Sequence, residues 1–350
     1  MYNTNNNLIL QWYDINKRDL PWRLTTDPYK IWVSEVMLQQ TQVSTVIPYY
    51  NNWIKNFPTI FSVANSRIDV LLKMWEGLGY YTRCRNFHKA SKIVVTKYSG
   101  IIPNNYNIII SLPGVGNYVA SAILSIAFNN QLPALDTNLK RVISRILGIK
   151  TLTKRNNNRI LKYAQNLVQC DRPGDINQAL MDIGSQICTT NKAICVKCPN
   201  QNYCKANESG KQLQYPKSIS KRTIPTKKMV AAFITLNGNI LIKQRRERGL
   251  LSGLWEFPTF EYDHSVTDSE INMIFNKNIG NDINIEFKIG SVKHSYSHFK
   301  TEVEFYICSK KHKNIILKNS KWIKPNEFER HTFSKVNHKL FQLIKKNKND

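Results

Sequence analysis

The sequence has 350 residues, more than one ordinary compact domain needs and enough for two. Lysine and arginine number 50 against 24 acidic residues, a formal net charge of +26. This surplus indicates a polyanionic partner, either nucleic acid or an acidic membrane surface, although genome-wide lysine bias would explain part of it. There is no apolar run of membrane-spanning length and no secretory signal pattern at the N-terminus, so we expect an intracellular protein outside the membrane.

Residues 8–206 carry the signals of a mostly helical domain. Asp27 and Pro28 supply an N-cap and a first-turn proline for one helix. Another helix is predicted to begin at Asp136 and to end at Gly148.

The stretch SLPGVGNYVASAI, residues 111–123, predicts a tight turn followed by a helix. Gly114 and Gly116 stand directly before a run of small and apolar residues. Glycines permit such a turn, and the free N–H groups at a helix N-terminus bind anions. We therefore predict an anion site here.

A change of hydrophobic period marks a second domain. Residues 207–228 contain six basic residues, one acid and two prolines, a composition typical of a linker. Beyond it, apolar residues alternate on both sides of Asn237-Gly238, which predicts a β-hairpin. Strands are also expected within 285–309, and DSEINMIFNKNIG between them is expected to be a helix. The fold class is therefore multidomain, an all-α part followed by an α+β part.

Cysteines cluster at the end of the helical part. Four of the seven follow the pattern C-x6-C-x2-C-x5-C: Cys188, Cys195, Cys198 and Cys204. Four thiolates in one short loop suit a tetrahedral zinc or a four-iron, four-sulfur cluster, and the spacing leaves both open. Zinc sites usually have two C-x2-C pairs, and only one is present. The odd count argues against a disulfide framework, and we expect Cys84, Cys170 and Cys308 to be small buried side chains.

The sequence around two carboxylates, Glu35 and Asp136, favours a protonated side chain at the first and an ionised one at the second. In YKIWVSEVMLQQTQV, helical spacing places Glu35 on one face with Ile31, Trp32 and Leu38. Burial there would raise its pKa and make it a proton donor, whereas the alternative is a solvated surface glutamate. Asp136 is a good helix N-cap, and this structural role alone would explain an aspartate there. A catalytic role is compatible with it, because the capping N–H groups also hold a carboxylate ionised. One protonated and one charged carboxylate is the arrangement that cleaves glycosidic bonds.

Groups of residues in a fixed order carry a family resemblance. They are LPWR, WVSEVMLQQTQV, GLGYYTRCRN, LPGVGNYVA, LDTNLKRV, the four cysteines, GLWEFP and HSYSHF. Over nearly the whole chain, this set resembles the adenine DNA glycosylases of the MutY type. The earlier motifs also fit the wider endonuclease III superfamily of helix–hairpin–helix glycosylases, and the two C-terminal motifs narrow the resemblance to the MutY type.

The resemblance implies a domain plan. A helix–hairpin–helix glycosylase domain would occupy 1–206, with a four-iron, four-sulfur cluster held by the loop 188–204. The basic linker 207–228 and a Nudix-like domain over 229–345 would follow. This second domain lacks the glutamate-rich helix of a pyrophosphohydrolase, so we expect it to recognise 8-oxoguanine rather than to hydrolyse a nucleotide.

The resemblance also implies a reaction, the removal of adenine mispaired with 8-oxoguanine or guanine in duplex DNA. Glu35 would protonate the adenine ring, and Asp136 would face the anomeric carbon and stabilise the oxocarbenium-like sugar. Tyr118 would hydrogen-bond this machinery. It stands where bifunctional relatives have a lysine, so the enzyme would be monofunctional, with simple packing as its alternative role. We expect a monomer in the cytoplasm, associated with a bacterial nucleoid.

Other matching positions imply contacts with DNA. Gln178 would touch the extruded adenine, while Gln40 and Tyr80, together with Leu38, would enter the base stack, because a base must be flipped out of the duplex before it can react. The glycine turn would hold a phosphate through its backbone amides. In the second domain the candidates for contact with 8-oxoguanine are Ser297 and His298. Without the resemblance, ordinary packing and a turn between strands would explain these residues.

Two positions depart from the family pattern, and two other functions compete. Thr137 stands where the family often has glycine, and Tyr296 where it has phenylalanine. An endonuclease III-like enzyme for oxidised pyrimidines would have a catalytic lysine after the glycine turn and no second domain. A non-catalytic DNA-binding module with a structural cluster would leave the acid at Glu35 unexplained.

Overall fold

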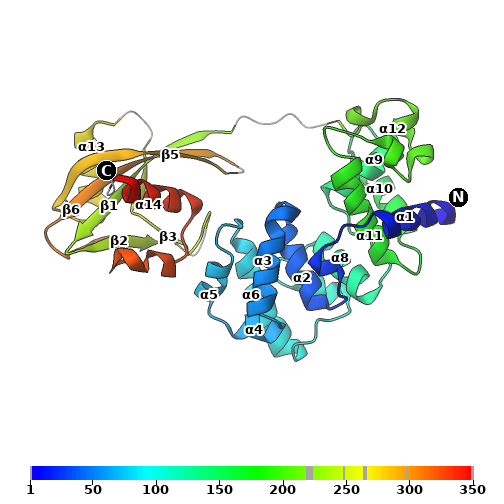
Figure 1. Ribbon diagram of the computed structural model, residues 1–350, viewed down its shortest axis with the longest axis horizontal. Coiled ribbons are helices and arrows are strands. Elements are labelled where there is room, and N and C mark those ends of the chain that lie inside the picture. Colours follow the sequence, from blue (N-terminus) through cyan, green and yellow to red (C-terminus); the bar gives the residue numbers. More distant parts are fainter. Residues whose placement is uncertain (1, 218–223, 247–248, 263–265, 297, 348–350) are drawn as a thin grey trace. The chain divides into compact units, whose positions relative to one another are not determined.

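The computed structural model describes residues 2–217, 224–246, 249–262, 266–296 and 298–347, and the chain divides into two compact units (Figure 1). The first unit contains residues 1–66 and 83–220, and the second contains 67–82 and 221–350. Within the described residues, no helix combines the length and the apolar character that crossing a membrane requires.

The first unit is built from helices, as expected. They are α1 (Tyr2–Asn16), α2 (Pro28–Leu38), α3 (Val43–Asn56), α4 (Ile60–Asn65), α6 (Thr82–Tyr98), α7 (Tyr106–Ser111), α8 (Asn117–Phe128), α9 (Thr137–Ile146), α10 (Lys154–Leu167), α11 (Pro173–Asp182) and α12 (Lys205–Glu208). The apolar helices α2 and α8 pack against each other and are buried along most of their lengths, because neither has a continuous polar face.

Helix α2 begins where the sequence predicts it. The Asp27 carboxylate accepts a hydrogen bond of 2.8 Å from the backbone N–H of Tyr29, and Pro28 occupies the first turn. The helix ends at Leu38, and two residues later Gln40 has a φ of 59°. The cap and this left-handed residue fix the length of the helix that carries Glu35.

The predicted glycine turn joins α7 to α8 as a helical hairpin. Gly114 has a φ of +79°, and a Cβ there would lie 2.7 Å from the Cβ of Asn86, so this position requires glycine on both counts. Gly116 is different, since it caps α8 with a φ of −102° and a Cβ there would meet nothing within 4 Å. The expectation that both glycines make the turn is therefore correct only for Gly114.

Helix α11 lies close to α8 and changes its winding at its end. A Cβ on Gly174 would lie 2.7 Å from the backbone oxygen of Ser125, so glycine permits this close approach. Directly after Asp182 the chain continues as a π-helical turn, Ile183–Ile187. Such wide turns occur frequently at functional sites.

The second unit is a mixed sheet with helices on both faces. Its strands are β1 (Thr226–Leu236), β2 (Asn239–Gln244), β3 (Trp255–Glu256), β4 (Thr259–Tyr262), β5 (Ile283–Ser295), β6 (Lys300–Lys310) and β7 (Ser320–Ile323), and its helices are α5 (Ile68–Met74), α13 (Asp268–Ile279) and α14 (Lys335–Asn347). The central path runs β3-β2-β1-β6-β5, with β1 and β6 parallel. Alternate residues of β1 and β6 contact α14 on one face and α13 on the other.

Local signals in this unit predict its elements well. Asn237 and Gly238 have φ values of 49° and 73°, as a type I′ hairpin requires, which confirms the predicted turn. The expected helix is α13, and the strands expected within 285–309 belong to β5 and β6. Strand β1 starts at Thr226, inside the predicted linker, because it pairs in parallel with β6 from Lys300 onward.

Candidate active site

Glu35 lies on the buried face of α2, as its apolar neighbours predict. The residue is 4% exposed and lines a cavity of about 40 Å³. Most of the wall comes from α2, α11 and the segment before α2, with single apolar residues from α3 and α8. The polar residues of the wall besides Glu35 are Arg18, Arg23, Ser34 and Gln178. Leu38 and Met181 contribute apolar parts of the wall. The alternative of a solvated surface glutamate is therefore wrong.

The surroundings of Glu35 favour its protonated form. Burial is the main cause and raises the pKa of Glu35 to about 7, with a smaller contribution from the negative charge of Asp136. A hydrogen bond from Tyr118 and the positive charge of Arg23 act in the opposite direction. Close to neutral pH, a substantial fraction of Glu35 is therefore protonated and able to donate.

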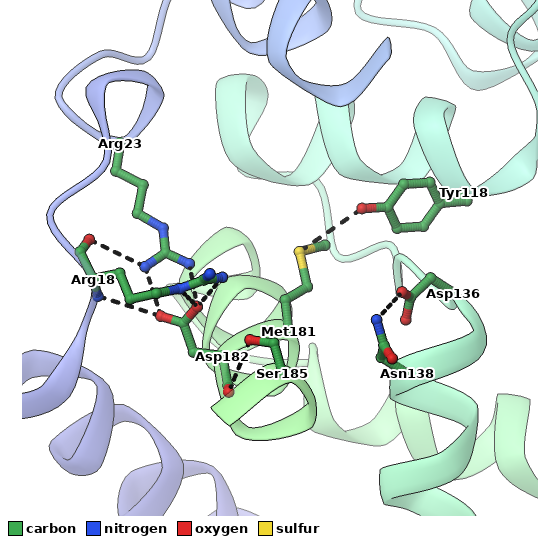
Figure 2. A network of polar contacts seen from close by, with 8 residues as sticks. All are labelled: Arg18, Arg23, Tyr118, Asp136, Asn138, Met181, Asp182 and Ser185. Atoms are coloured by element: carbon green, nitrogen blue, oxygen red, sulfur yellow. Dashed lines mark hydrogen bonds and ion pairs between the residues drawn. The ribbon is translucent and has the colours of Figure 1, made fainter. Parts of the chain in front are cut away.

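Asp136 caps α9 with its carboxylate, half-buried at the helix N-terminus. Its Oδ1 accepts a hydrogen bond of 2.7 Å from the backbone N–H of Leu139. Its Oδ2 accepts one of 3.0 Å from Asn138 Nδ2 (Figure 2). Burial raises the pKa of Asp136, and these hydrogen bonds oppose the rise. Arg141, a member of the motif LDTNLKRV to which no role was assigned, supports the arrangement by donating to Asn138 Oδ1 at 2.9 Å.

Tyr118 stands between Glu35 and an open cleft. Its hydroxyl hydrogen-bonds the Glu35 carboxylate. The same hydroxyl lies 3.8 Å from the sulfur of Met181 (Figure 2). The ring lines a cleft of about 510 Å³ whose walls come from α7, α8, α9 and α10. Burial, and then the two neighbouring carboxylates, raise the pKa of Tyr118 well above its usual value, so the phenol remains a neutral donor.

Gln40 and Tyr80 share an uncommon backbone conformation. Both are exposed, with φ values of 59° and 49°, in a region that few non-glycine residues occupy and that is enriched at functional sites. Arg83, which lies in the motif GLGYYTRCRN but was given no role there, holds the chain before Gln40. Its guanidinium donates to the carbonyl oxygens of Val36, Met37 and Gln39 at 2.9, 2.7 and 2.6 Å.

The four clustered cysteines line one small cavity of about 20 Å³, together with apolar side chains of α9 and the loop 188–204. Arg145 Nη1 lies 3.2 Å from the sulfur of Cys188. In the part of the chain that the structure describes, no three or more His, Cys, Asp or Glu side chains are grouped as ligands of a metal ion. Of the remaining cysteines, Cys84 and Cys308 are fully buried as expected, whereas Cys170 is only half-buried.

The expected 8-oxoguanine contacts fall at the connection between β5 and β6. Ser297 lies outside the described residues, and His298 is exposed. Next to them, the ring of Tyr296 packs against those of His294 and Phe299, with centroids 4.6 and 5.1 Å apart. Tyr296 thus supports the end of this hairpin as an aromatic side chain, as a phenylalanine would.

A buried acid, a helix-capping aspartate and a helical hairpin beside them define a helix–hairpin–helix DNA glycosylase. Residues 33–166 match the HhH-GPD superfamily of base excision DNA repair proteins, and residues 229–343 match the NUDIX domain. A solved thermostable thymine-DNA glycosylase has a similar fold, with a TM-score of 0.55 and 28% identity, covering 59% of this chain and 97% of that one.

Similarity to curated relatives shows which kind of DNA glycosylase this chain is. The chain is 38% identical to the adenine DNA glycosylase of Buchnera aphidicola subsp. Acyrthosiphon pisum, over 83% of each chain. It is 30% identical to the human adenine DNA glycosylase, over 96% of this chain and 73% of the human one. The chain belongs to the adenine DNA glycosylase family, and its activity is base excision repair of DNA.

Proposed function

We propose that the enzyme removes adenine opposite 8-oxoguanine or guanine in duplex DNA and leaves the strand intact. The observation that carries this proposal is the burial of Glu35, with a pKa of about 7, in the cavity that Gln178 also lines. A volume of about 40 Å³ suits water rather than a purine, so entry of the base requires side chains such as Leu38 and Met181 to move.

The proposed chemistry uses the two carboxylates in different states. Protonated Glu35 gives its proton to a ring nitrogen of the flipped adenine, and the glycosidic bond breaks with its electron pair going to the base. The negative charge of Asp136 stabilises the oxocarbenium-like sugar, either across space or through a transient bond. Water then attacks the anomeric carbon, and the ionised Glu35 accepts the released proton.

Binding of the duplex would use other residues, which come from both units. Gln40 and Tyr80, each exposed on a left-handed residue, suit entry into the base stack: an amide can bond to an orphan base, and a phenol ring can stack. The turn at Gly114, with the N-terminus of α8, would hold a phosphate through N–H groups. Ser297 and His298 would contact the base opposite the adenine.

We also propose that the four cysteines hold a four-iron, four-sulfur cluster. All four thiols face one cavity, and the guanidinium of Arg145 beside Cys188 would offset thiolate charge. A cubane cluster separates its thiolates more widely than a single zinc ion does, which suits side chains that line a cavity without meeting at one point. When bound, the cluster would tie the loop 188–204 to α9, the helix that Asp136 caps.

The purified protein is expected to be brown and to contain about four iron atoms and four labile sulfides per chain. Replacing Cys198 by serine should remove the colour and lower the melting temperature, because the loop 188–204 loses a covalent anchor. Replacing the half-buried Cys170 by serine is the matched control and should leave the iron content unchanged. One zinc ion in place of iron after anaerobic preparation would contradict the proposal.

The substrate is tested on four duplexes under single-turnover conditions: adenine opposite 8-oxoguanine, adenine opposite thymine, an oxidised thymine opposite adenine, and thymine opposite guanine. We expect base release only from the first, and breakage of the strand only after alkali, because Tyr118 lacks the amine that forms a Schiff base. In a separate comparison of two duplexes, with adenine opposite 8-oxoguanine and opposite guanine, His298→Ala in the full chain should reduce the preference for 8-oxoguanine. Preferred release of a pyrimidine, or strong borohydride trapping, would contradict the assignment.

A further inference from the structure

Asp182 is a fully buried acid that the proposed chemistry does not use. It is the last residue of α11, one turn after Gln178, and its side chain is 0% exposed. Two arginines from the segment before α2 converge on it (Figure 2). Arg23 forms a two-pronged bond, with Nη1 donating to Oδ2 at 2.6 Å and Nη2 donating to Oδ1 at 2.9 Å.

The second arginine completes the cluster. Arg18 Nε donates to Asp182 Oδ1 at 2.6 Å, and its Nη2 lies 2.5 Å from the same oxygen. Arg23 Nη1 also donates to the backbone oxygen of Arg18 at 3.3 Å. The side chains of Arg18 and Arg23 are only 25% and 7% exposed, so water screens their charges poorly.

Both arginines line the cavity of Glu35. Two guanidinium charges and one carboxylate leave one net positive charge in the cavity wall. Without Asp182 the wall would carry two positive charges, which would favour ionised Glu35 and would also oppose protonation of a purine.

We infer that Asp182 is a positioning residue for base excision: it fixes Arg18 and Arg23 in the wall of the Glu35 cavity and neutralises one of their two charges. This inference rests on the proposed role of Glu35 as the acid. The other charged or titratable groups that face Glu35 are Tyr118 from α8 and Asp136 at the start of α9. Neither is altered by the test below.

The test measures the single-turnover rate of adenine excision from pH 5 to 9 for the wild type, Asp182→Asn, Arg18→Gln and the double variant. For Asp182→Asn, the pH at which the rate is half-maximal should be about half to one pH unit lower than for the wild type, because the cavity wall gains one positive charge. For Arg18→Gln this midpoint pH should be higher, because the wall loses one positive charge. The double variant has the wild-type net charge and should return to the wild-type midpoint. A residue that only stabilises the fold would leave all four midpoints equal.

Circular dichroism establishes which variants are folded. If Asp182→Asn alone does not fold, the upward shift of Arg18→Gln and the wild-type midpoint of the double variant decide the question. An active wild type with unshifted variants rejects the role of Asp182 but leaves the proposed function intact. A wild type that does not excise adenine rejects the proposed function, and this inference with it.

Discussion

Asp136→Asn is expected to bind mispaired duplex DNA almost as the wild type does and to excise adenine at least about a hundredfold more slowly. The asparagine oxygen can still accept the hydrogen bond from the N–H of Leu139, so the cap of α9 remains. What is lost is the negative charge that stabilises the sugar cation in the proposed mechanism. Rapid-quench measurement of base release, together with a binding titration, separates the two effects.

The matched control is Asp27→Asn, because Asp27 also caps a helix through its carboxylate but does not line the Glu35 cavity. It should excise adenine at close to the wild-type rate. Near-normal excision by Asp136→Asn, or an equal loss in both variants, would reject the role of Asp136 at the reacting sugar.

Glu35→Gln is expected to abolish measurable excision while the protein remains folded and binds DNA. An amide fills the same space but has no acidic proton to donate to the base. The variant should also be more stable than the wild type at pH 8 and similar to it at pH 5. The pKa of Glu35 is higher in the folded state, at about 7, than in the unfolded chain, so the wild type loses stability as the pH rises between these two values.

Melting curves at the two pH values check this second effect independently of DNA. Equal melting temperatures for the wild type and Glu35→Gln at both values would show that Glu35 is not held protonated by burial. Excision by Glu35→Gln within tenfold of the wild-type rate would show that another group supplies the proton.

The sequence predicts the parts of the site that depend on local signals. The cap of α2 at Asp27, the cap of α9 at Asp136 and the turn at Gly114 are each set by residues within a few positions of one another. The burial of Glu35 follows from the helical spacing of its apolar neighbours. These features indicate the local setting of each carboxylate, whereas the approach of Glu35 and Asp136 to each other depends on the tertiary packing.

The remaining parts of the site depend on contacts between distant segments. Arg23 and Asp182 are separated by 159 positions, and Arg83 reaches the carbonyl groups of α2 across more than 40. Arg23 and Arg83 lie within motifs of the family resemblance, but their local sequence does not indicate their partners, because only the packing of α11 and α6 brings them together. The parallel pairing of β1 with β6 escaped prediction for the same reason, since it joins strands whose paired residues are 74 positions apart, such as Thr226 and Lys300.

In the proposed mechanism a protonated, buried Glu35 donates the proton that releases adenine. The pH dependence of the excision rate of the wild-type enzyme is the sharpest test of this role. Single-turnover excision of adenine opposite 8-oxoguanine would be measured from pH 5 to 9 with saturating enzyme. We expect a rate that begins to fall near pH 7, the pKa of Glu35, and then falls by about tenfold per pH unit. A rate that stays constant from pH 6 to 9 would contradict it.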